Sequence, residues 1–366
     1  MQHSLDQSVG EPIILKTPLT GEYSSAFVYR DLDNDRVNEC VAFYALSSSD
    51  SVHMSILDTD SQGAWFSAGD TVGSGSDVAS LSFADVDGNG REEILVTWQI
   101  PESKNNQYLS VYGQYSPENG VVSMIDELYT AFHILDADAD GSAELFLAVI
   151  EPAGDSYTAT GKLFDYHASH RQIEPISEIA LDPTVTSYAN ICHDYEGSVC
   201  RLYLDGVVSE THRITELLQI SSSDLRLQIP ENQGEEIGAF SLRPGTDNCC
   251  DINGDGYIEI PSYVPLDNSV VLDRENAVSE TLYMTVWSRF SSGNMVPTYR
   301  YLSLPEWGYL FEFPEQWIGQ VSAVKDIKLE RLRFYLLNEN GETTHMLFCI
   351  DWIHSSAERE TDALNS

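Results

Sequence analysis

The chain has 366 residues, and 58 acidic against 19 basic side chains give it a formal net charge of -39. Such a charge repels nucleic acid, so we expect no nucleic-acid partner. A hydrophobic content of 42% and an aromatic content of 10% predict a globular rather than a disordered chain. We expect no transmembrane span, because no apolar run is long enough, and the polar first residues do not resemble a signal peptide.

An acidic loop followed by an apolar, strand-like segment recurs along the chain. The copies are DLDNDRVNE from Asp31, DVDGNGREE from Asp85, DADADGSAE from Asp136 and DINGDGYIE from Asp251. The gap before the last copy holds two periods, and CHDYEGSVC, residues 192–200, is an altered copy within it. Two further strand-like segments follow in each period of roughly 50 residues. This pattern predicts an all-β fold, a β-propeller of about five four-stranded blades.

The repeats suggest a division of the chain into four parts. We expect a flexible N-terminus over residues 1–11, the propeller over 12–302 and a small C-terminal α+β or β domain over 303–354, with a polar tail over 355–366. A sixth, metal-free blade is the alternative for the C-terminal part. PIILKTPL, residues 12–19, could close the ring against the last blade or cover an edge strand.

The acidic loops have the ligand spacing of a calcium site. Calcium takes six to eight oxygen ligands, and acidic residues at alternate loop positions direct their oxygens to one point. Positions 1, 3, 5, 7 (backbone carbonyl) and 9 are Asp31, Asp33, Asp35, Val37 and Glu39; Asp85, Asp87, Asn89, Arg91 and Glu93; Asp136, Asp138, Asp140, Ser142 and Glu144; and Asp251, Asn253, Asp255, Tyr257 and Glu259. We therefore expect about four structural calcium ions. Arg36 replaces the turn glycine of position 6, so the first site should be distorted or weaker.

These loops are not EF-hands, because position 12 lacks the bidentate Glu and the flanking segments are strand-like. The nine-residue loop between strands resembles the FG-GAP and VCBS repeats, the calcium-binding hairpins of the integrin alpha-subunit propeller and of many secreted bacterial proteins. The resemblance covers roughly residues 12–300 and implies structural calcium and an extracellular or cell-surface location, with a lipid anchor at a removed N-terminus as one form of it. YLFEFPEQWIGQV, from Tyr309, also resembles a segment of secreted or lipid-anchored Gram-positive proteins.

The altered copy carries cysteines at its first and last ligand positions, Cys192 and Cys200. In an intact loop both positions reach the same ion, so their side chains converge. We expect a disulfide in place of the ion, with two reduced thiols as the alternative. We assign no disulfide partner to the other four cysteines.

Known catalytic motifs are missing, including the nucleophile elbow, HExxH and phosphate-binding glycine loops. We therefore expect a secreted or cell-surface, calcium-stabilised binding or adhesion scaffold that recognises a protein or glycan. The alternative is a carbohydrate-active or phosphoester-cleaving enzyme. A concave pocket that combines His, Arg or Lys with a carboxylate would favour the enzyme.

Two other groups of residues have an ordinary and a functional interpretation. His167 and His170 lie in the polar run DYHASHRQ and are expected to be exposed loop residues, although they could face one another across a site. Trp65, Trp98 and Trp287 are expected to pack between blades rather than to form a sugar-binding surface.

Overall fold

The structure is a computed structural model that describes residues 1–49, 51–101, 103, 105–118, 120–154, 156–231, 236–272, 281–304 and 307–352. The expected tail, residues 355–366, lies outside the described residues. The chain is all-β, with 58% strand and 5% helix, which confirms the predicted fold class. No helix among the described residues is long and apolar enough to cross a membrane.

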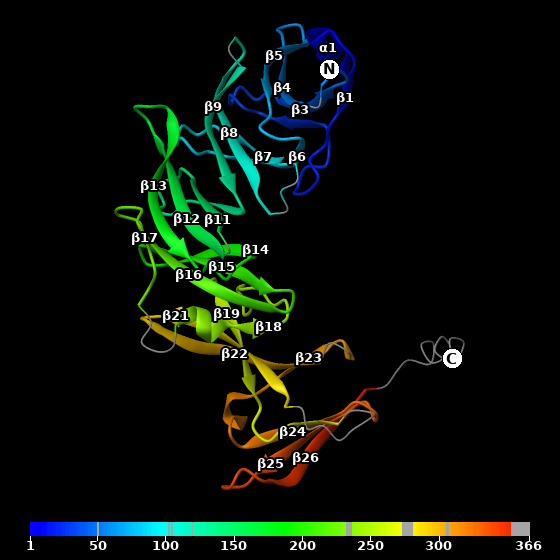
Figure 1. Cartoon of the computed structure of the whole chain (residues 1–366), viewed down its shortest axis with the longest axis vertical. Helices are drawn as coiled ribbons and strands as arrows, with labels where there is room; N and C mark the ends of the chain where they lie inside the picture. Colours follow the sequence, from blue (N-terminus) through cyan, green and yellow to red (C-terminus); the bar gives the residue numbers. More distant parts are fainter. Residues whose placement is uncertain are drawn as a thin grey trace, which may run out of the picture. The chain divides into compact units, whose positions relative to one another are not determined.

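The strands form six sheets, and most strands pair with the next strand along the chain (Figure 1). The first three sheets contain β1 (Ile13–Leu15), β2 (Phe27–Arg30), β3 (Glu39–Leu46), β4 (Val52–Thr59) and β5 (Trp65–Val72); β6 (Asp77–Ala84), β7 (Glu93–Gln99), β8 (Gln107–Ser116) and β9 (Gly120–Tyr129); and β10 (Ala131–Leu135), β11 (Glu144–Ala153), β12 (Ser156–His167) and β13 (Gln172–Leu181). The last three contain β14 (Ser187–Glu196), β15 (Val199–Ser209), β16 (His212–Ser221), β17 (Leu227–Gln228) and β18 (Arg243–Pro244); β19 (Glu259–Pro265), β21 (Tyr283–Ser291), β22 (Asn294–Leu304) and β23 (Tyr309–Glu312); and β20 (Val270–Leu272), β24 (Val321–Asp326), β25 (Arg331–Leu337) and β26 (Thr343–Asp351). Among the described residues the helical segments are α1 (Gln2–Val9), α2 (Ile237–Ser241) and the 3-10 turn η2 (Glu315–Trp317).

The chain divides into two compact units. One comprises residues 1–210 with 216–230, and the other comprises residues 211–215 with 231–366. The expected boundary at residue 302 falls inside β22, which pairs with β21 and β23 in one sheet. The sixth sheet contains β20, from before that boundary, in parallel with β24.

In each of the first three sheets, the strand that directly follows the acidic loop is buried along most of its length. In β3, β7 and β11 the residues from Glu39, Glu93 and Glu144 onward are almost all buried. Strands covered on both faces are near-continuous apolar runs, which explains ECVAFYAL and ELFLAVI. The packing expected of Trp98 and Trp287 is confirmed, since they are 0% and 3% exposed, whereas Trp65 is half-buried against the Tyr29 ring.

The N-terminus differs from its prediction. Residues 2–9 form α1, and Leu5 is 0% exposed because it packs with Cys40 and Leu57. β1 pairs with β3 of the same sheet, with Ile13 opposite Leu46 in antiparallel register, which agrees with the edge-cover alternative and not with ring closure against the last repeat.

Candidate metal centres in the acidic loops

Each acidic loop ends where a buried strand begins. Three loops join β2 to β3, β6 to β7 and β10 to β11, and the fourth leads into β19. The glutamate of position 9 is the first residue of the following strand in every case, and it is at most 2% exposed; these residues are Glu39, Glu93, Glu144 and Glu259. A carboxylate at the mouth of a buried strand needs a partner that offsets its lost hydration.

Backbone donors hold the four loops in one common conformation. The carboxylate of position 1 accepts the N–H of residue 6 at 3.0, 2.8, 3.1 and 2.8 Å in chain order. The side chain of position 3 accepts the N–H of residue 5, and the side chain of position 5 accepts the N–H of residue 7. The position-9 glutamate accepts the N–H of residue 2. The loops therefore curl around their own carboxylates.

Residue 6 adopts a left-handed backbone conformation in every loop. Its φ is 75° at Arg36, against 81°, 95° and 86° at Gly90, Gly141 and Gly256. The first loop keeps the same hydrogen bonds as the others, so the distortion expected from Arg36 is not observed. The substitution instead places a side chain in a strained region of backbone space, which only glycine occupies at no cost.

Three loops gather three carboxylates each. Within each group the oxygens lie within 4.8 Å of one another; the groups are Asp31, Asp33 and Glu39; Asp85, Asp87 and Glu93; and Asp136, Asp138 and Glu144. The Oδ1 atoms of Asp31 and Asp85 are buried and accept no hydrogen bond. Position 5 lies outside these triads, and its Oδ1 accepts the N–H of residue 7.

Burial and mutual repulsion disfavour the charged state of the triads. Burial, followed by the neighbouring aspartates, raises the pKa of Glu39 to about 7, of Glu93 to about 7 and of Glu144 to about 8. Burial also raises the pKa of Asp33 and Asp138. A divalent cation would reverse this balance, because it favours the deprotonated carboxylates.

Three of the loops have a further charged residue beside them, on the strand that pairs with the one following the loop. The sequence alone did not identify these residues. Asp58 follows Leu57, which pairs with Cys40 in the first sheet, and Asp165 follows Phe164, which pairs with Leu145 in the third. Both aspartates help to raise the pKa of the adjacent position-9 glutamate. In the fifth sheet Arg289 pairs directly with Glu259. Strand register is the only signal that connects these residues to the loops.

The fourth loop differs from the other three at position 3. Its position 3 is Asn253, whose Nδ2 donates to Glu259 Oε1 at 3.0 Å, where the other loops have a second carboxylate oxygen. Arg289 adds a positive charge across from the same glutamate. This loop therefore offers fewer carboxylate groups than the first loop does.

The first three loops are linked to one another by direct hydrogen bonds. Asn34 Nδ2 donates to the Gly90 carbonyl at 2.7 Å, and Ala143 N donates to the Asp85 carbonyl at 2.8 Å. Tyr195, from the altered copy, donates to the Asp136 carbonyl at 2.8 Å. Neighbouring sites are thereby connected through loop backbone.

The altered copy contains no disulfide, so the predicted bridge is wrong. Neither cysteine is disulfide-bonded, and the two lie on the paired strands β14 and β15. Cys192 lies opposite Tyr203, three residues from Cys200, which corresponds to about 10 Å along a strand and exceeds the reach of a disulfide. The hairpin turns tightly at residues 197–198 instead of forming a nine-residue loop.

A guanidinium neutralises the acidic residues of this copy. Arg201 is 0% exposed and donates to both carboxylate oxygens of Asp194, at 2.6 and 3.0 Å, and to Glu196 at 3.0 Å. Tyr203 donates a further hydrogen bond to Asp194. A buried side-chain cation thus lies where the other copies have a candidate ion site and where we expected a disulfide.

A separate cavity of about 290 Å³ combines a histidine with carboxylates. It is lined by Ser8, Val9, Glu11, Tyr44, Leu46, His53, Ser67 and Asp70. Asp70 accepts from Tyr44 Oη at 2.6 Å and lies 2.8 Å from His53 Nδ1, while the Tyr44 ring stacks on His53. Burial and the Asp70 hydrogen bond raise the pKa of Tyr44. This is the kind of pocket that would favour the enzyme interpretation.

No family model and no curated protein matches the chain. Among solved structures, the chain is similar to a GH43 β-1,3-galactosidase with galactodeoxynojirimycin, at 7% identity and a TM-score of 0.28, covering 78% of this chain and 96% of that one. It is also similar to an exo-β-1,3-galactanase from Phanerochaete chrysosporium, with β-1,3-galactotriose at 9% identity and a TM-score of 0.33, and with galactose at 10% and 0.31. Both galactanase alignments cover 89% of this chain and 79% of the other.

These findings correct two predictions. The resemblance to FG-GAP and VCBS repeats is wrong as a family assignment, since the structures found are glycoside hydrolases and no family model matches. The prediction of an adhesion scaffold, which depended on the same resemblance, is corrected together with it. A loop motif that needs only a hairpin and alternating oxygens predicts a metal site, but it does not specify a family.

Proposed function

We propose that the acidic loops bind calcium and that the bound ions stabilise the β-sheets. The observation that supports this most strongly is the repeated triad, in which three carboxylates from one nine-residue loop lie within 4.8 Å of one another in three separate sheets. Carboxylates brought this close repel one another unless a cation or protons neutralise them.

The donor set favours calcium over other divalent ions. Every ligand candidate is an oxygen atom, which disfavours zinc and copper, since these prefer nitrogen and sulfur. Calcium accepts irregular coordination by carboxylates and backbone carbonyls, whereas magnesium requires near-ideal octahedral geometry. A nine-residue loop with its carboxylates pulled inward by backbone N–H groups provides the irregular kind of site.

The ions would act as clamps between strands. Each triad connects the segment after one strand to the first residue of the next. In the first sheet, Asp31 directly follows β2 and Glu39 begins β3. We also propose an extracellular location, because modules of this kind bind calcium at roughly 0.1 to 1 mM, a concentration found outside cells.

Calcium binding to the purified chain tests this proposal. Calorimetric titration of chelator-treated protein should detect at least three sites, and Asp138→Ala should remove one of them. Asp224→Ala, which removes an exposed carboxylate outside the loops, should leave the stoichiometry unchanged. An isotherm without binding at millimolar calcium, or an equal count in Asp138→Ala, would contradict the proposal.

A second candidate function is glycan cleavage at the His53 cavity. Asp70 holds one nitrogen of His53, and the cavity also contains Glu11, so it offers two carboxyl groups and an imidazole. Glycoside hydrolysis uses a pair of carboxyl groups, one of them as an acid. A glycan is therefore the ligand class that we propose for this cavity.

Substrate screening tests the second candidate. β-1,3-Linked galactosides belong in the panel because they occur in the similar structures, together with other aryl glycosides and an aryl phosphodiester. A glycosidase is supported if the wild-type chain cleaves a glycoside, the Asp70→Asn variant does not, and the Asp224→Asn variant still does. Absence of turnover on the whole panel, or equal activity in both variants, would remove this candidate without affecting the calcium proposal.

A further inference from the structure

The turn between β12 and β13 brings two imidazoles and a carboxylate together, outside the acidic loops. His167 ends β12, and Glu174 lies near the start of β13. Backbone hydrogen bonds from His170 N and Arg171 N to the His167 carbonyl, at 3.0 and 2.9 Å, hold the turn. Arg171 closes the turn in a left-handed conformation, with a φ of 55°. The backbone thus places both histidines on the same side of the hairpin end.

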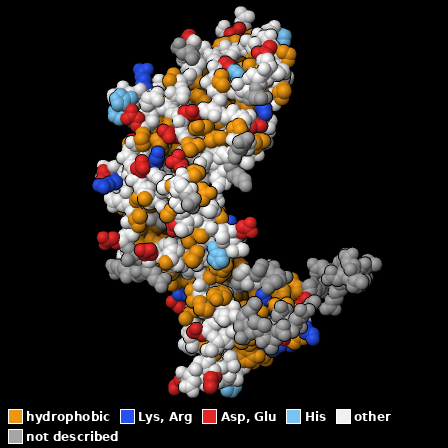
Figure 2. All heavy atoms as spheres, viewed as in Figure 1, with side chains coloured by type: hydrophobic (Ala, Val, Ile, Leu, Met, Phe, Trp, Pro, Cys, Tyr) orange, Lys and Arg blue, Asp and Glu red, His pale blue; other side chains and the backbone are white. Residues whose placement is uncertain are grey.

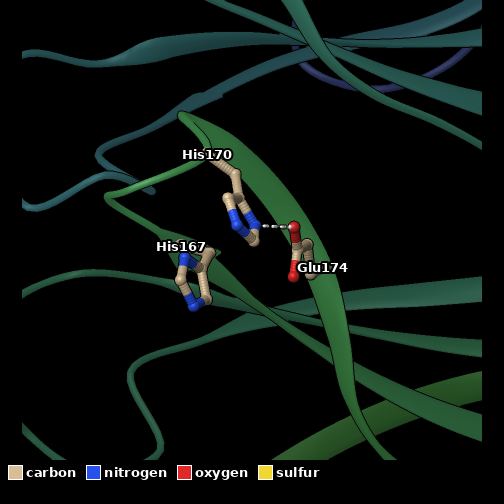
Figure 3. A group of neighbouring side chains, drawn as sticks. All are labelled: His167, His170 and Glu174. Atoms are coloured by element: carbon tan, nitrogen blue, oxygen red, sulfur yellow. Dashed lines mark hydrogen bonds and ion pairs between the residues drawn. The ribbon is translucent and has the colours of Figure 1, made fainter.

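The three side chains already lie close to one another. The imidazole rings stack with centroids 4.3 Å apart and an interplanar angle of 14°. His170 Nδ1 lies 2.6 Å from Glu174 Oε1, as Figure 3 shows. One ring nitrogen from each histidine and one carboxylate oxygen all lie within 4.8 Å of one another.

From this geometry we infer a binding site for a divalent transition metal ion, of the zinc type, formed by His167, His170 and Glu174. Two imidazoles and a carboxylate are a common ligand set for zinc and a poor one for calcium, which requires more oxygen atoms. Ligand atoms in a tetrahedral zinc site lie about 3.3 Å apart, as follows from bond lengths of about 2.0 to 2.1 Å. Small rotations of exposed side chains would close the remaining distance, and the fourth position is open to water.

A second contact prepares His167 for this role. Ser169 Oγ lies 3.0 Å from His167 Nδ1, so the hydroxyl can accept the Nδ1 proton. Nε2 then carries the lone pair, which is the tautomer that a metal bound at Nε2 requires. For His170 the ion would replace the contact with Glu174 by two metal bonds. The net charge of -39 also concentrates divalent cations near the surface.

The site is independent of the calcium loops, and the experiment must keep the two apart. Zinc is titrated calorimetrically into chelator-treated protein that has been equilibrated with millimolar calcium, so that the oxygen sites are filled. We expect one zinc ion per chain at this turn. His170→Ala should abolish this binding and Glu174→Gln should weaken it at least about tenfold. His345→Ala, which removes an exposed histidine of β26, serves as the matched control and should bind as the wild type does.

A second readout locates the ion. In two-dimensional NMR of the imidazole nitrogens, the His167 and His170 signals should shift together on addition of one equivalent of zinc, whereas those of His345 stay in place. Zinc binding of equal affinity in wild type and His170→Ala would place the ion elsewhere and overturn the inference. Absence of any zinc binding in wild type would overturn it equally.

Discussion

At the residue scale, the altered repeat shows that the negative charge of the acidic side chains can be neutralised by an arginine of the same chain. Three loops leave their carboxylates converging on an open point, whereas Asp194 and Glu196 receive the guanidinium of Arg201. The sequence pointed to Cys192 and Cys200 because they occupy ligand positions of the aligned motif. The alignment failed because the hairpin turns two residues after Tyr195, and this shifts the pairing so that Tyr195 lies opposite Cys200.

Removing Arg201 tests its role. Arg201→Met leaves Asp194 buried without its charged partner, and we expect a loss of about 3 to 5 kcal/mol in the free energy of unfolding. Urea denaturation measures this loss. Arg226→Met, at an exposed arginine, should change stability by about 0.5 kcal/mol or less. A similar, small effect in both variants would show that the buried pair is not a stabilising element.

A histidine pair makes stability depend on pH. His133 Nε2 lies 2.7 Å from His193 Nδ1, and burial together with the neighbouring imidazole lowers the pKa of His133 to about 4. Burial also lowers the pKa of His193, against the opposing charge of Asp194. The Tyr195 ring packs edge-on against His193.

The sign of the effect follows from proton uptake by the unfolded chain. Unfolded His133 takes up a proton near pH 6.5, whereas folded His133 does so only near pH 4. Its contribution to stability is therefore complete above pH 6.5 and is lost as the pH falls toward 4, by an amount on the order of 2 kcal/mol. His133→Asn should lose less stability than wild type between pH 6.5 and 4.5, measured by urea denaturation. Equal losses, or an imidazole NMR midpoint of His133 near 6.5, would refute this explanation.

At the element scale, local motifs proved predictable and long-range register did not. The loop conformation depends on residues within nine positions of one another, so alternating acidic residues and glycines were enough to locate it. Asp58, Asp165 and Arg289 reach the loops only through strand pairing, which no local pattern encodes. The same reason explains β1, which pairs with β3 of its own sheet.

The flanking charges predict that the loops differ in affinity. Calcium affinity rises with the number of charged ligands around the site. Asp165 adds a negative charge beside the third loop, and Asp58 adds one beside the first. The fourth loop has Asn253 in place of an acid, and Arg289 pairs with its glutamate. In a calcium titration followed by backbone amide NMR, the signals of Gly141 and Arg36 should change first and that of Gly256 last.

Adding the missing carboxylate should strengthen the fourth loop. Asn253→Asp should move the Gly256 transition to lower calcium concentration, by several-fold, because the new oxygen faces Glu259 where the amide now donates. Asn340→Asp adds the same charge in the exposed turn between β25 and β26, outside the acidic loops. This control should leave the Gly256 transition unchanged. A Gly256 transition unchanged by Asn253→Asp, or one that precedes that of Gly141, would contradict the ranking.

At the scale of the whole molecule, the acidic excess predicts that cations stabilise the folded chain. The formal charge of -39 is spread over the surface, and Figure 2 shows acidic side chains along the visible face. The all-β fold class followed from the four-strand period, whereas the family did not follow from the motif. The reason is physical, since a calcium loop stabilises any hairpin that can accommodate it.

The thermal stability of the chain with and without calcium tests the central claim most directly. At pH 8, where Glu39 and Glu93 are largely deprotonated and Glu144 is about half deprotonated, 10 mM calcium should raise the melting temperature by at least about 5 °C over chelator. This follows from about 1.4 to 2.7 kcal/mol per site at 0.1 to 1 mM affinity. At pH 5 these glutamates are protonated in the folded chain, because their pKa values are about 7, 7 and 8, so the gain should be much smaller. A melting temperature at pH 8 that is the same in chelator and in calcium would contradict the account.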